Sequence, residues 1–331
     1  MGTRRASMAG VRKLARDLAA VVGARLAPSR GASEEALDAR LLAIAARVED
    51  LAAASAVHGE QLRVATEILR TLHDEEAINR LRLHELRRGE DYERAYDDPD
   101  PLVSVIMPTY NRPDMLCERS IPSVLAQTHQ NFEIVVVGDG SPDAVGVAVA
   151  SIGDPRIRFV NSSVRGPYSA IAEHAWMSVG TPPYNRAMAE ARGRWLAPLG
   201  DDDSFTPDHI ELLLAAARER RLELVYGRLR AHYPNGSQDV FGEFPPRTEF
   251  TELQASFGLQ ASLIHGGLRF MQMHLTDPLF GLANDMALSR RMVRAGVLVG
   301  MIDEVVADYF PARVWEPGNP APIEKSAAPS S

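Results

Sequence analysis

Three adjacent carboxylates, Asp201, Asp202 and Asp203, carry the strongest chemical signal in this sequence. Charges this close repel by roughly 4 kcal/mol per pair at an effective dielectric of about 20, so a cation is expected to offset them. Hard carboxylate oxygens suit Mg²⁺ or Mn²⁺, which keep several waters and bridge to substrate phosphates. Capping of the next helix does not require the triplet, because Thr206-Pro207-Asp208 already supplies the start signals. The triplet therefore predicts a divalent-cation site, with a solvated acidic turn as the alternative.

Two earlier polar stretches each follow a short apolar run. The first is Pro108-Thr109-Tyr110-Asn111-Arg112, and the second is Asp139-Gly140-Ser141. Tyr110 offers a face for a nucleobase, and Asp139 can accept a hydrogen bond from a base imide or a ribose hydroxyl. Asp139-Gly140 alone is also an ordinary turn dipeptide. A further acid, Asp285 of Asn284-Asp285, opens a predicted helix, where the helix dipole alone would favour a negative charge.

These stretches have to be positioned by an alternation of strands and helices. Strands are expected at 102–107, 132–137, 157–160, 194–199 and 222–226, helices at 113–127, 185–191 and 207–220, and a hairpin at 232–241. Such alternation predicts an α/β fold, a mostly parallel sheet with crossover helices and an antiparallel addition. Open sheets of this kind bind ligands beyond the carboxyl ends of their strands, where the polar stretches fall.

The bulk composition excludes several other classes. The chain has 331 residues, 45% of them hydrophobic, and a net charge of −8. That charge argues against nucleic-acid binding, which needs a basic surface. The single cysteine, Cys117, excludes an internal disulfide framework. No apolar run approaches the roughly 20 residues of a membrane span, and no secretory signal is evident, so a cytoplasmic location is predicted.

A helical arm is predicted to precede the sheet domain. Residues 34–88 place apolar side chains at alternating steps of four and three: Leu37, Leu41, Ile44, Val48, Leu51, Leu62, Ala65, Leu69 and Leu72, resuming at Leu83 and Leu86. This heptad pattern predicts a self-associating coiled coil, with a hairpin at Gly59 as the rival. A basic amphipathic stretch at 8–26 suits either an anionic membrane surface at the inner face or ordinary packing. The expected division is an arm at 1–96, a catalytic domain at 100–313 and a disordered tail at 316–331.

Taken together, the motifs resemble family 2 glycosyltransferases, which are inverting enzymes of the GT-A fold, across residues 102–310. The matching residues are Val103 to Arg112 (opening strand), Asp139-Gly140-Ser141 (uracil-contacting turn), Asn185 to Gly193 (helix before the metal motif), Asp201-Asp202-Asp203 (DxD-type motif), Asn284-Asp285 (Glu-Asp pair), and Arg290 or Arg291 (following basic residue). There are departures, because Gly138 and Gly200 stand where many members carry another Asp, and Asn284 replaces the common Glu. A further departure is the long insertion 162–183, with Tyr168, His174 and Trp176, which is either part of the acceptor wall or a surface loop.

The resemblance implies a Rossmann-like, mostly parallel mixed sheet with helices on both faces. It further implies transfer of a sugar from a nucleotide-diphosphate sugar, a UDP-sugar first of all, with Mn²⁺ or Mg²⁺ held by Asp201, Asp202 and Asp203. Asp285 would be the general base, and the donor would be bound by Pro108, Thr109, Tyr110, Asn111, Arg112, Asp139, Asn185 and Asp201. The acceptor would be a glycan, a lipid-linked glycan or a protein, as in the synthesis of cell-surface polysaccharide.

Polar candidates for acceptor contacts are His265, His274 and Asp277, each of which also suits a structural role. Two rival functions remain. A nucleotidyltransferase would need a glycine- and lysine-rich triphosphate loop, which Pro108 to Pro113 does not supply. A non-catalytic coiled-coil assembly protein would keep only the nucleotide-binding fold.

Overall fold

The computed structural model describes residues 34–242 and 258–311 and divides the chain into two compact units, Met1–His73 and Asp74–Ser331. The described part of the first unit is one helix, α2 (Glu34–His73), which is continuous through Gly59. The hairpin at Gly59, which was the alternative to a coiled coil, is therefore not formed. The basic stretch 8–26 and the tail 316–331 lie outside the described residues. No helix in the described part of the chain is both long and apolar enough to cross a membrane.

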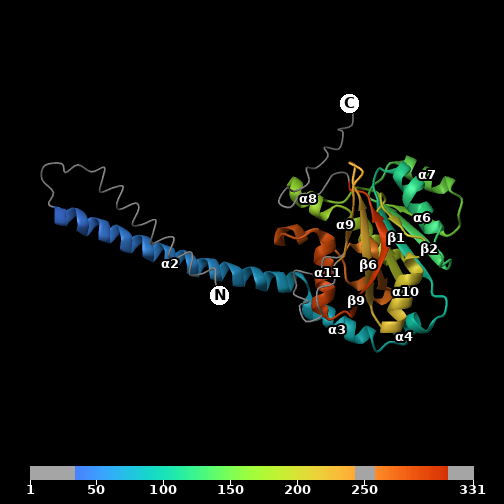
Figure 1. Ribbon diagram of the computed structural model, residues 1–331, viewed down its shortest axis with the longest axis horizontal. Coiled ribbons are helices and arrows are strands. Elements are labelled where there is room, and N and C mark those ends of the chain that lie inside the picture. The colour runs from blue at the N-terminus through green and yellow to red at the C-terminus, as the bar shows by residue number, and fades with distance from the viewer. Residues whose placement is uncertain (1–33, 243–257, 312–331) are drawn as a thin grey trace, which may run out of the picture. The chain divides into compact units, whose positions relative to one another are not determined.

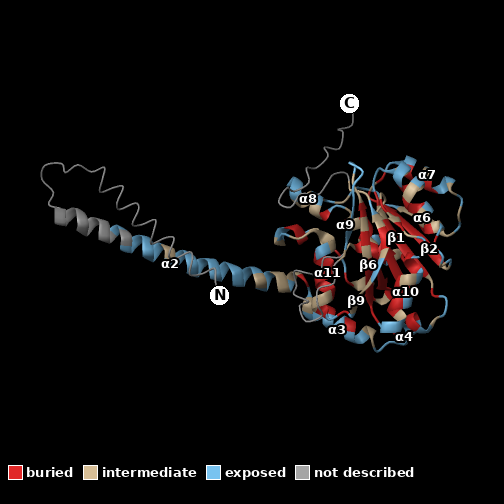
Figure 2. Cartoon of the chain, in the orientation of Figure 1, coloured by how far each residue is buried: buried red, intermediate tan, exposed pale blue. Residues whose placement is uncertain are grey.

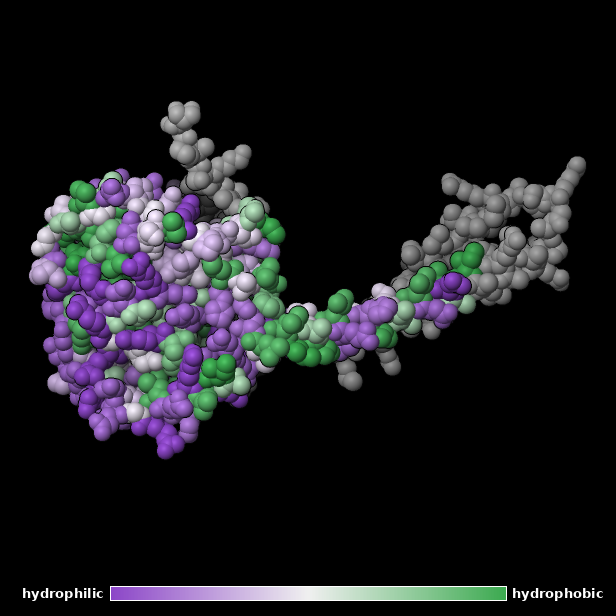
Figure 3. Space-filling model, turned by 180° about the vertical axis from the view of Figure 1, so that it is seen from behind, coloured by the Kyte–Doolittle hydropathy of each residue, from purple (hydrophilic) through white to green (hydrophobic). Residues whose placement is uncertain are grey.

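The apolar side chains of α2 that fall on the heptad pattern are exposed within this chain. Leu51, Leu62 and Leu72 are 65%, 68% and 70% exposed, and Figure 3 shows apolar side chains along much of the helix. Helices in proteins gain most of their stability by packing an apolar face. Coiled-coil pairing of this helix and self-association of the chain stay predictions, which sedimentation equilibrium on the full chain would check.

The second unit begins earlier than the sequence suggested. Glu75 adopts a left-handed conformation, with φ of 50°, and separates α2 from α3 (Glu76–Leu86), which α4 (Glu90–Asp97) follows. Leu83 is only 1% exposed, because it packs into the core of the sheet domain. Residues 74–96, which were predicted to belong to the helical arm, thus belong to the sheet domain. The heptad spacing does not continue one helix past Glu75. Leu83 is apolar because it packs in the core of the sheet domain, not because it belongs to a coiled coil.

A mixed sheet of nine strands forms the centre of the described part of this unit (Figure 1). The strands are β1 (Val103–Thr109), β2 (Phe132–Gly138), β3 (Ile157–Asn161), β4 (Trp195–Pro198), β5 (Ser204–Phe205), β6 (Leu224–His232), β7 (Gln238–Phe241), β8 (Ser262–His265) and β9 (Val299–Tyr309). Their order is β3-β2-β1-β4-β8-β6-β9-β5, with β7 paired to β6. Strands β3, β2, β1 and β4 are parallel, β8 runs antiparallel to both neighbours, and β6 and β9 are parallel. The predicted hairpin is confirmed as β6 and β7.

Helices cover both faces of the sheet, as predicted. One face packs against α4, α6 (Ile121–Leu125), α7 (Asp143–Ser151) and α10 (His209–Arg220). The other packs against α3, α9 (Thr181–Glu190) and α11 (Asn284–Ala295). Figure 2 shows the buried residues concentrated in the strands between these layers. The described fold also contains the short helix α8 (Ala172–Ser178) and three short 3₁₀ turns, Leu259–Ala261, Gly266–Phe270 and Asp277–Phe280.

The strand register gathers the chemical motifs at one edge of the sheet. The last pairs between β1 and its neighbours are Thr109 with Gly138 and Ile106 with Pro198. Because these strands are parallel, the residues after Thr109, Gly138 and Pro198 leave the sheet on the same side. The three polar stretches identified in the sequence are therefore neighbours in space.

The predicted helix at 113–127 is interrupted by a π-helical turn. The chain runs through α5 (Pro113–Met115), the π turn (Leu116–Ser120) and α6. Pro122 has no backbone N–H, so the regular hydrogen-bond ladder cannot pass through it. Such turns often occur at functional sites, and this one lies beside the acidic triplet.

Candidate active site

Two carboxylates of the acidic triplet converge on a single cationic group. Asp201 Oδ1 lies 3.4 Å from Arg112 Nη1, and Asp202 Oδ2 forms an ion pair with the same nitrogen. The other oxygen of Asp201 accepts a hydrogen bond of 2.7 Å from Thr109 Oγ1. The end of β1 and the loop after β4 thus hold the carboxylates together. A positive charge already occupies the place where the sequence predicted a cation.

The backbone of the triplet is fixed by the π turn. Arg119 Nη1 donates to the Asp202 carbonyl at 2.7 Å, and Ser120 Oγ donates to the Asp203 carbonyl at 2.8 Å. The departure at Gly200 also has a steric reason. A Cβ there would lie 3.2 Å from Asp202 Oδ1 and 3.3 Å from Asp203 Oδ2. A larger residue would crowd the carboxylates.

The helix-start signals after the triplet act differently from the prediction. Helix α10 begins at His209, and Thr206 Oγ1 donates to the Val306 carbonyl instead of capping the helix. The N-cap residue Asp208 makes no side-chain capping bond. The triplet is not used for capping either, since its carboxylates contact Thr109, Arg112 and Phe310.

The triplet is electrostatically costly when no cation is bound. Burial and the charge of Asp202 raise the pKa of Asp203 to about 8, against a hydrogen bond of 3.2 Å from the Phe310 N–H. The same two causes raise the pKa of Asp201. Both shifts show that negative charge at this place is unfavourable by itself, so the site favours whatever neutralises it.

This cost leads to a prediction about stability. Folded Asp203 holds its proton up to about pH 8, whereas the unfolded side chain loses it near 3.8, so the folded state binds more protons between these values. Stability should fall as pH rises from about 4 to about 8. Asp203→Asn removes this charge and should raise the unfolding temperature of the cation-free protein at pH 8.5 by about 3 °C or more. Thermal melts from pH 5 to 9 check this, with the exposed Asp208→Asn as control, and an unchanged pH slope in Asp203→Asn would contradict it.

The predicted base, Asp285, lies in the first turn of α11. Its Oδ1 accepts a hydrogen bond of 2.7 Å from the Met286 N–H, and burial raises its pKa. Asn284 fixes the start of the helix, because its Nδ2 donates to the Val179 carbonyl at 3.0 Å and to Thr181 Oγ1 at 2.9 Å. The neutral amide that replaces the family's common Glu thus has a structural task.

One tyrosine links the triplet and the base. Tyr309 ends β9, and the pairing of β5 with β9 brings it to the triplet. Burial raises the pKa of Tyr309 to about 12, with further contributions from the charges of Asp203, Asp202 and Asp285. The hydroxyl of Tyr309 therefore lies within electrostatic range of both the acidic triplet and Asp285, which are far apart in the sequence.

The predicted nucleoside residues lie next to segment 162–183. Asp139 is 3% exposed, and its two oxygens accept hydrogen bonds from Tyr168 Oη at 2.5 Å and the Gly166 N–H at 2.9 Å. The guanidinium of Arg165 lies 4.0 Å from the ring centre of Tyr110. Asn111 is exposed beside Tyr110. The segment thus packs directly on the turn that was expected to hold the base.

The family comparison decides which class of site this is. Residues 104–180 and 183–280 match the family described as Glycosyl transferase family 2, and together they make up more than half of the chain. The chain belongs to glycosyl transferase family 2. The match contains residues 104–109 of the opening strand, the turn Asp139-Gly140-Ser141 and the acidic triplet, as the sequence motifs had indicated.

Two relatives of this glycosyltransferase are named for succinoglycan biosynthesis and for glucosyl transfer. It is 36% identical to the succinoglycan biosynthesis protein ExoO of Rhizobium meliloti over 121 residues, or 36% of this chain and 31% of ExoO. It is 29% identical over 162 residues to WfgD of Escherichia coli, named UDP-Glc:alpha-D-GlcNAc-diphosphoundecaprenol beta-1,3-glucosyltransferase, or 48% of this chain and 58% of WfgD. The matches thus span less than two thirds of either relative. S. aureus TarS in complex with UDP-GlcNAc aligns with a TM-score of 0.47 and 14% identity, over 64% of this chain and 59% of that one.

Several predicted site residues of the glycosyltransferase are engaged in structural contacts. The amide of Asn185 bonds both the carbonyl and the N–H of Met273, at 2.8 and 3.0 Å, so it ties α9 to a loop. Arg290 pairs with Asp74 at 2.5 Å. His265 is buried among Tyr92, Tyr96 and Trp195, where Nδ1 accepts from the Gly267 N–H at 3.0 Å.

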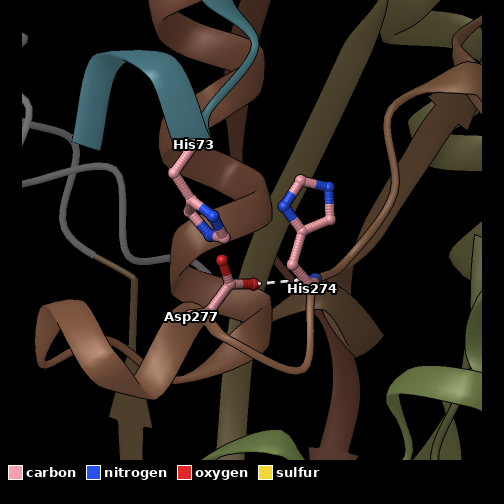
Figure 4. Close-up of side chains that lie close together, drawn as sticks. All are labelled: His73, His274 and Asp277. Atoms are coloured by element: carbon pink, nitrogen blue, oxygen red, sulfur yellow. Dashed lines mark hydrogen bonds between the residues drawn. The ribbon is translucent and has the colours of Figure 1, made fainter. Parts of the chain in front are cut away.

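Asp277 and His274, considered for the acceptor, hold a loop in shape. The His274 N–H donates to Asp277 Oδ2 at 2.9 Å (Figure 4). Asp277 is 1% exposed and also pairs with Arg291, which is equally buried in α11. Arg291, one of the two arginines expected after the base, therefore holds α11 to the loop of Asp277 through a buried ion pair.

The structure also adds site residues that the motifs did not reveal. Arg119 and Ser120 bind the backbone of the triplet, and Arg165 lies over the ring of Tyr110. Tyr309 lies within electrostatic range of the triplet. The only local signal was Pro122, which breaks the helix after Arg119. The other contacts join residues far apart in the sequence, so only the fold reveals them.

Proposed function

We propose that this chain transfers a sugar from a UDP-sugar to an acceptor hydroxyl with inversion at the anomeric carbon. The observation that carries the proposal is the convergence of Asp201 and Asp202 on one cationic nitrogen at the carboxyl edge of β1 and β4. A diphosphate bound there would lie beside the loop 108–112, which follows β1. Membership of the family supports the same reaction class.

A divalent cation fits the groups that are present. The oxygens of Asp201 and Asp202 are hard ligands, and the guanidinium of Arg112 shows that they can share one positive charge. Asp203 is buried next to them, and a bound cation would favour loss of its proton, which would add a third negative charge to the site. When bound, Mn²⁺ or Mg²⁺ would stabilise the charge of the departing diphosphate. Arg112 would then be free to contact phosphate oxygens, which its planar group suits.

The protein's own part in the chemistry is the removal of a proton. Asp285 would accept the proton of the acceptor hydroxyl while that oxygen attacks the anomeric carbon. Burial raises the pKa of Asp285, which makes it a stronger base than an exposed carboxylate. A single displacement of this kind inverts the configuration.

For the acceptor, we propose a lipid-linked or polysaccharide glycan. The proposal is supported by the names of ExoO and WfgD, the second of which describes a diphosphoundecaprenol-linked acceptor. Such an acceptor lies at a membrane surface, which the basic stretch 8–26 could contact peripherally at the cytoplasmic face. A protein acceptor would be the alternative outcome of an acceptor assay.

A thermal-shift screen tests the donor proposal. UDP, UDP-glucose, UDP-GlcNAc, GDP and CMP would be added to the full chain with and without Mn²⁺. We expect stabilisation by uridine nucleotides that requires Mn²⁺, because a ligand that binds the folded state raises the unfolding temperature. Stabilisation by GDP alone would replace the proposed UDP-sugar donor with a GDP-sugar. If none of the five compounds stabilises the chain in a cation-dependent way, the proposed function is overturned.

A further inference from the structure

Segment 162–183 makes close contact with the turn Asp139-Gly140-Ser141, here called the nucleoside turn because a nucleoside is predicted to bind there. A Cβ on Gly140, whose φ is +64°, would lie 2.6 Å from the Arg165 nitrogen and 2.8 Å from the Val164 carbonyl carbon. Only glycine fits there without moving the segment. Tyr168 and Gly166 occupy both oxygens of Asp139. The segment is therefore tightly packed against the turn.

The hydroxyl of Tyr168 makes two hydrogen bonds in different directions. It donates to Asp139 Oδ2 at 2.5 Å and accepts from the Gly180 N–H at 3.2 Å. Burial and the bond to Asp139 raise the pKa of Tyr168, so it keeps its proton at neutral pH. One hydroxyl therefore joins the nucleoside turn to the far end of the segment.

That far end is bonded to the helix of the predicted base. Gly180 has a φ of +82° and precedes Thr181, the first residue of α9. Asn284 Nδ2 donates to Thr181 Oγ1 at 2.9 Å and to the Val179 carbonyl at 3.0 Å. Asn284 Oδ1 accepts from the Asp285 N–H at 2.8 Å. A continuous series of contacts thus runs from Asp139 to Asp285.

We propose that Tyr168 is a positioning residue, whose hydroxyl couples the nucleoside-binding turn at Asp139 to the placement of Asp285. The proposal rests on the proposed function for its catalytic consequence, but the coupling itself is a property of the fold. A nucleoside that settles against Asp139 and Tyr110 would hold the segment down. The same segment then holds the start of α11, so that the base is ordered when donor is present.

Two variants distinguish this coupling from the alternative that segment 162–183 only lines the donor site and does not affect Asp285. Tyr168→Phe removes both hydrogen bonds and keeps the ring. Thr181→Val removes only the acceptor for Asn284 and keeps the branched shape. Glu173→Gln, an exposed position in the same segment, is the control. Thermal melts would show whether each variant is folded.

Hydrogen exchange and binding are then measured on the full chain. Amides of residues 284–290 should exchange at least about threefold faster in Tyr168→Phe and in Thr181→Val than in the wild type or the control. The affinity for UDP with Mn²⁺ should fall roughly tenfold in Tyr168→Phe and stay unchanged in Thr181→Val. With saturating UDP-glucose or UDP-GlcNAc, kcat should fall in both variants.

The outcomes are distinguishable. Wild-type exchange rates at 284–290 in both variants would overturn the coupling, whatever UDP does. If Tyr168→Phe does not fold, the effect of UDP on exchange decides: UDP should slow exchange at 284–290 in the wild type and slow it less in Thr181→Val, and equal slowing in both would overturn the coupling. If UDP fails to bind even the wild type, the proposed function fails, and the exchange data still test the coupling.

Discussion

An Asp285→Asn variant is expected to lose sugar transfer by roughly 10²- to 10⁴-fold, the usual contribution of a general base. The amide can still accept the Met286 N–H, so the start of α11 should stay intact. Donor binding should be unchanged, because Asp285 is not among the predicted donor contacts, which lie at the ends of β1, β2 and β4 and at Asn185 in α9. The measurement is kcat with a saturating UDP-sugar, together with UDP affinity by calorimetry.

The control for this variant is Asp91→Asn. Asp91 is also an acid in the first turn of a helix, α4, but it is exposed and pairs with Arg94. If Asp285 only complemented the helix dipole, the two variants would behave alike. Equal turnover in Asp285→Asn and wild type would remove Asp285 from the mechanism, whereas no turnover in the wild type would favour the non-catalytic alternative.

The pH dependence of kcat gives a second readout of the same residue. Burial raises the pKa of Asp285, and a base acts only in its deprotonated form. The rate should therefore rise with pH through a value above the ordinary range of an aspartate, and the residual rate of Asp285→Asn should lack this rise.

The second large effect is expected from the acidic triplet. Asp202→Asn should weaken cation-dependent UDP binding at least roughly 100-fold, because a direct ligand should matter at least as much as the outer contacts that typically change metal affinity 10- to 100-fold. Asp201→Asn should act similarly, although Thr109 keeps its side chain in place. Calorimetry of UDP with Mn²⁺ measures both, and Asp208→Asn, an exposed acid a few residues along, is the control. Wild-type affinity in both triplet variants would contradict the assignment.

Local sequence predicted much of the sheet and the acidic groups. Strands β1, β2 and β4 are short apolar runs buried on both faces, so their pattern is readable without the fold. The triplet and Asp285 were found because each lies where a strand or helix signal ends or begins. Strand β9 was missed because its outer residues, including Asp303, are polar, and Asp303 is exposed in an ion pair with Arg228.

What the sequence did not predict depends on contacts between distant residues. Asn185 bonds Met273, and Tyr168 bonds Asp139, across many intervening residues. Leu83 fits a heptad by spacing, yet it is buried in the sheet domain, because Glu75 turns the chain after α2. Spacing arguments assume one continuous helix and fail where a single residue ends it.

The claim on which the account depends is that the acidic triplet holds a divalent cation against a diphosphate. Titration of Mn²⁺ into the wild-type chain, with and without saturating UDP, tests it most directly. We expect saturable uptake of Mn²⁺ that UDP strengthens at least about tenfold and that Asp202→Asn abolishes. If no Mn²⁺ is taken up even when UDP is present, the claim is wrong.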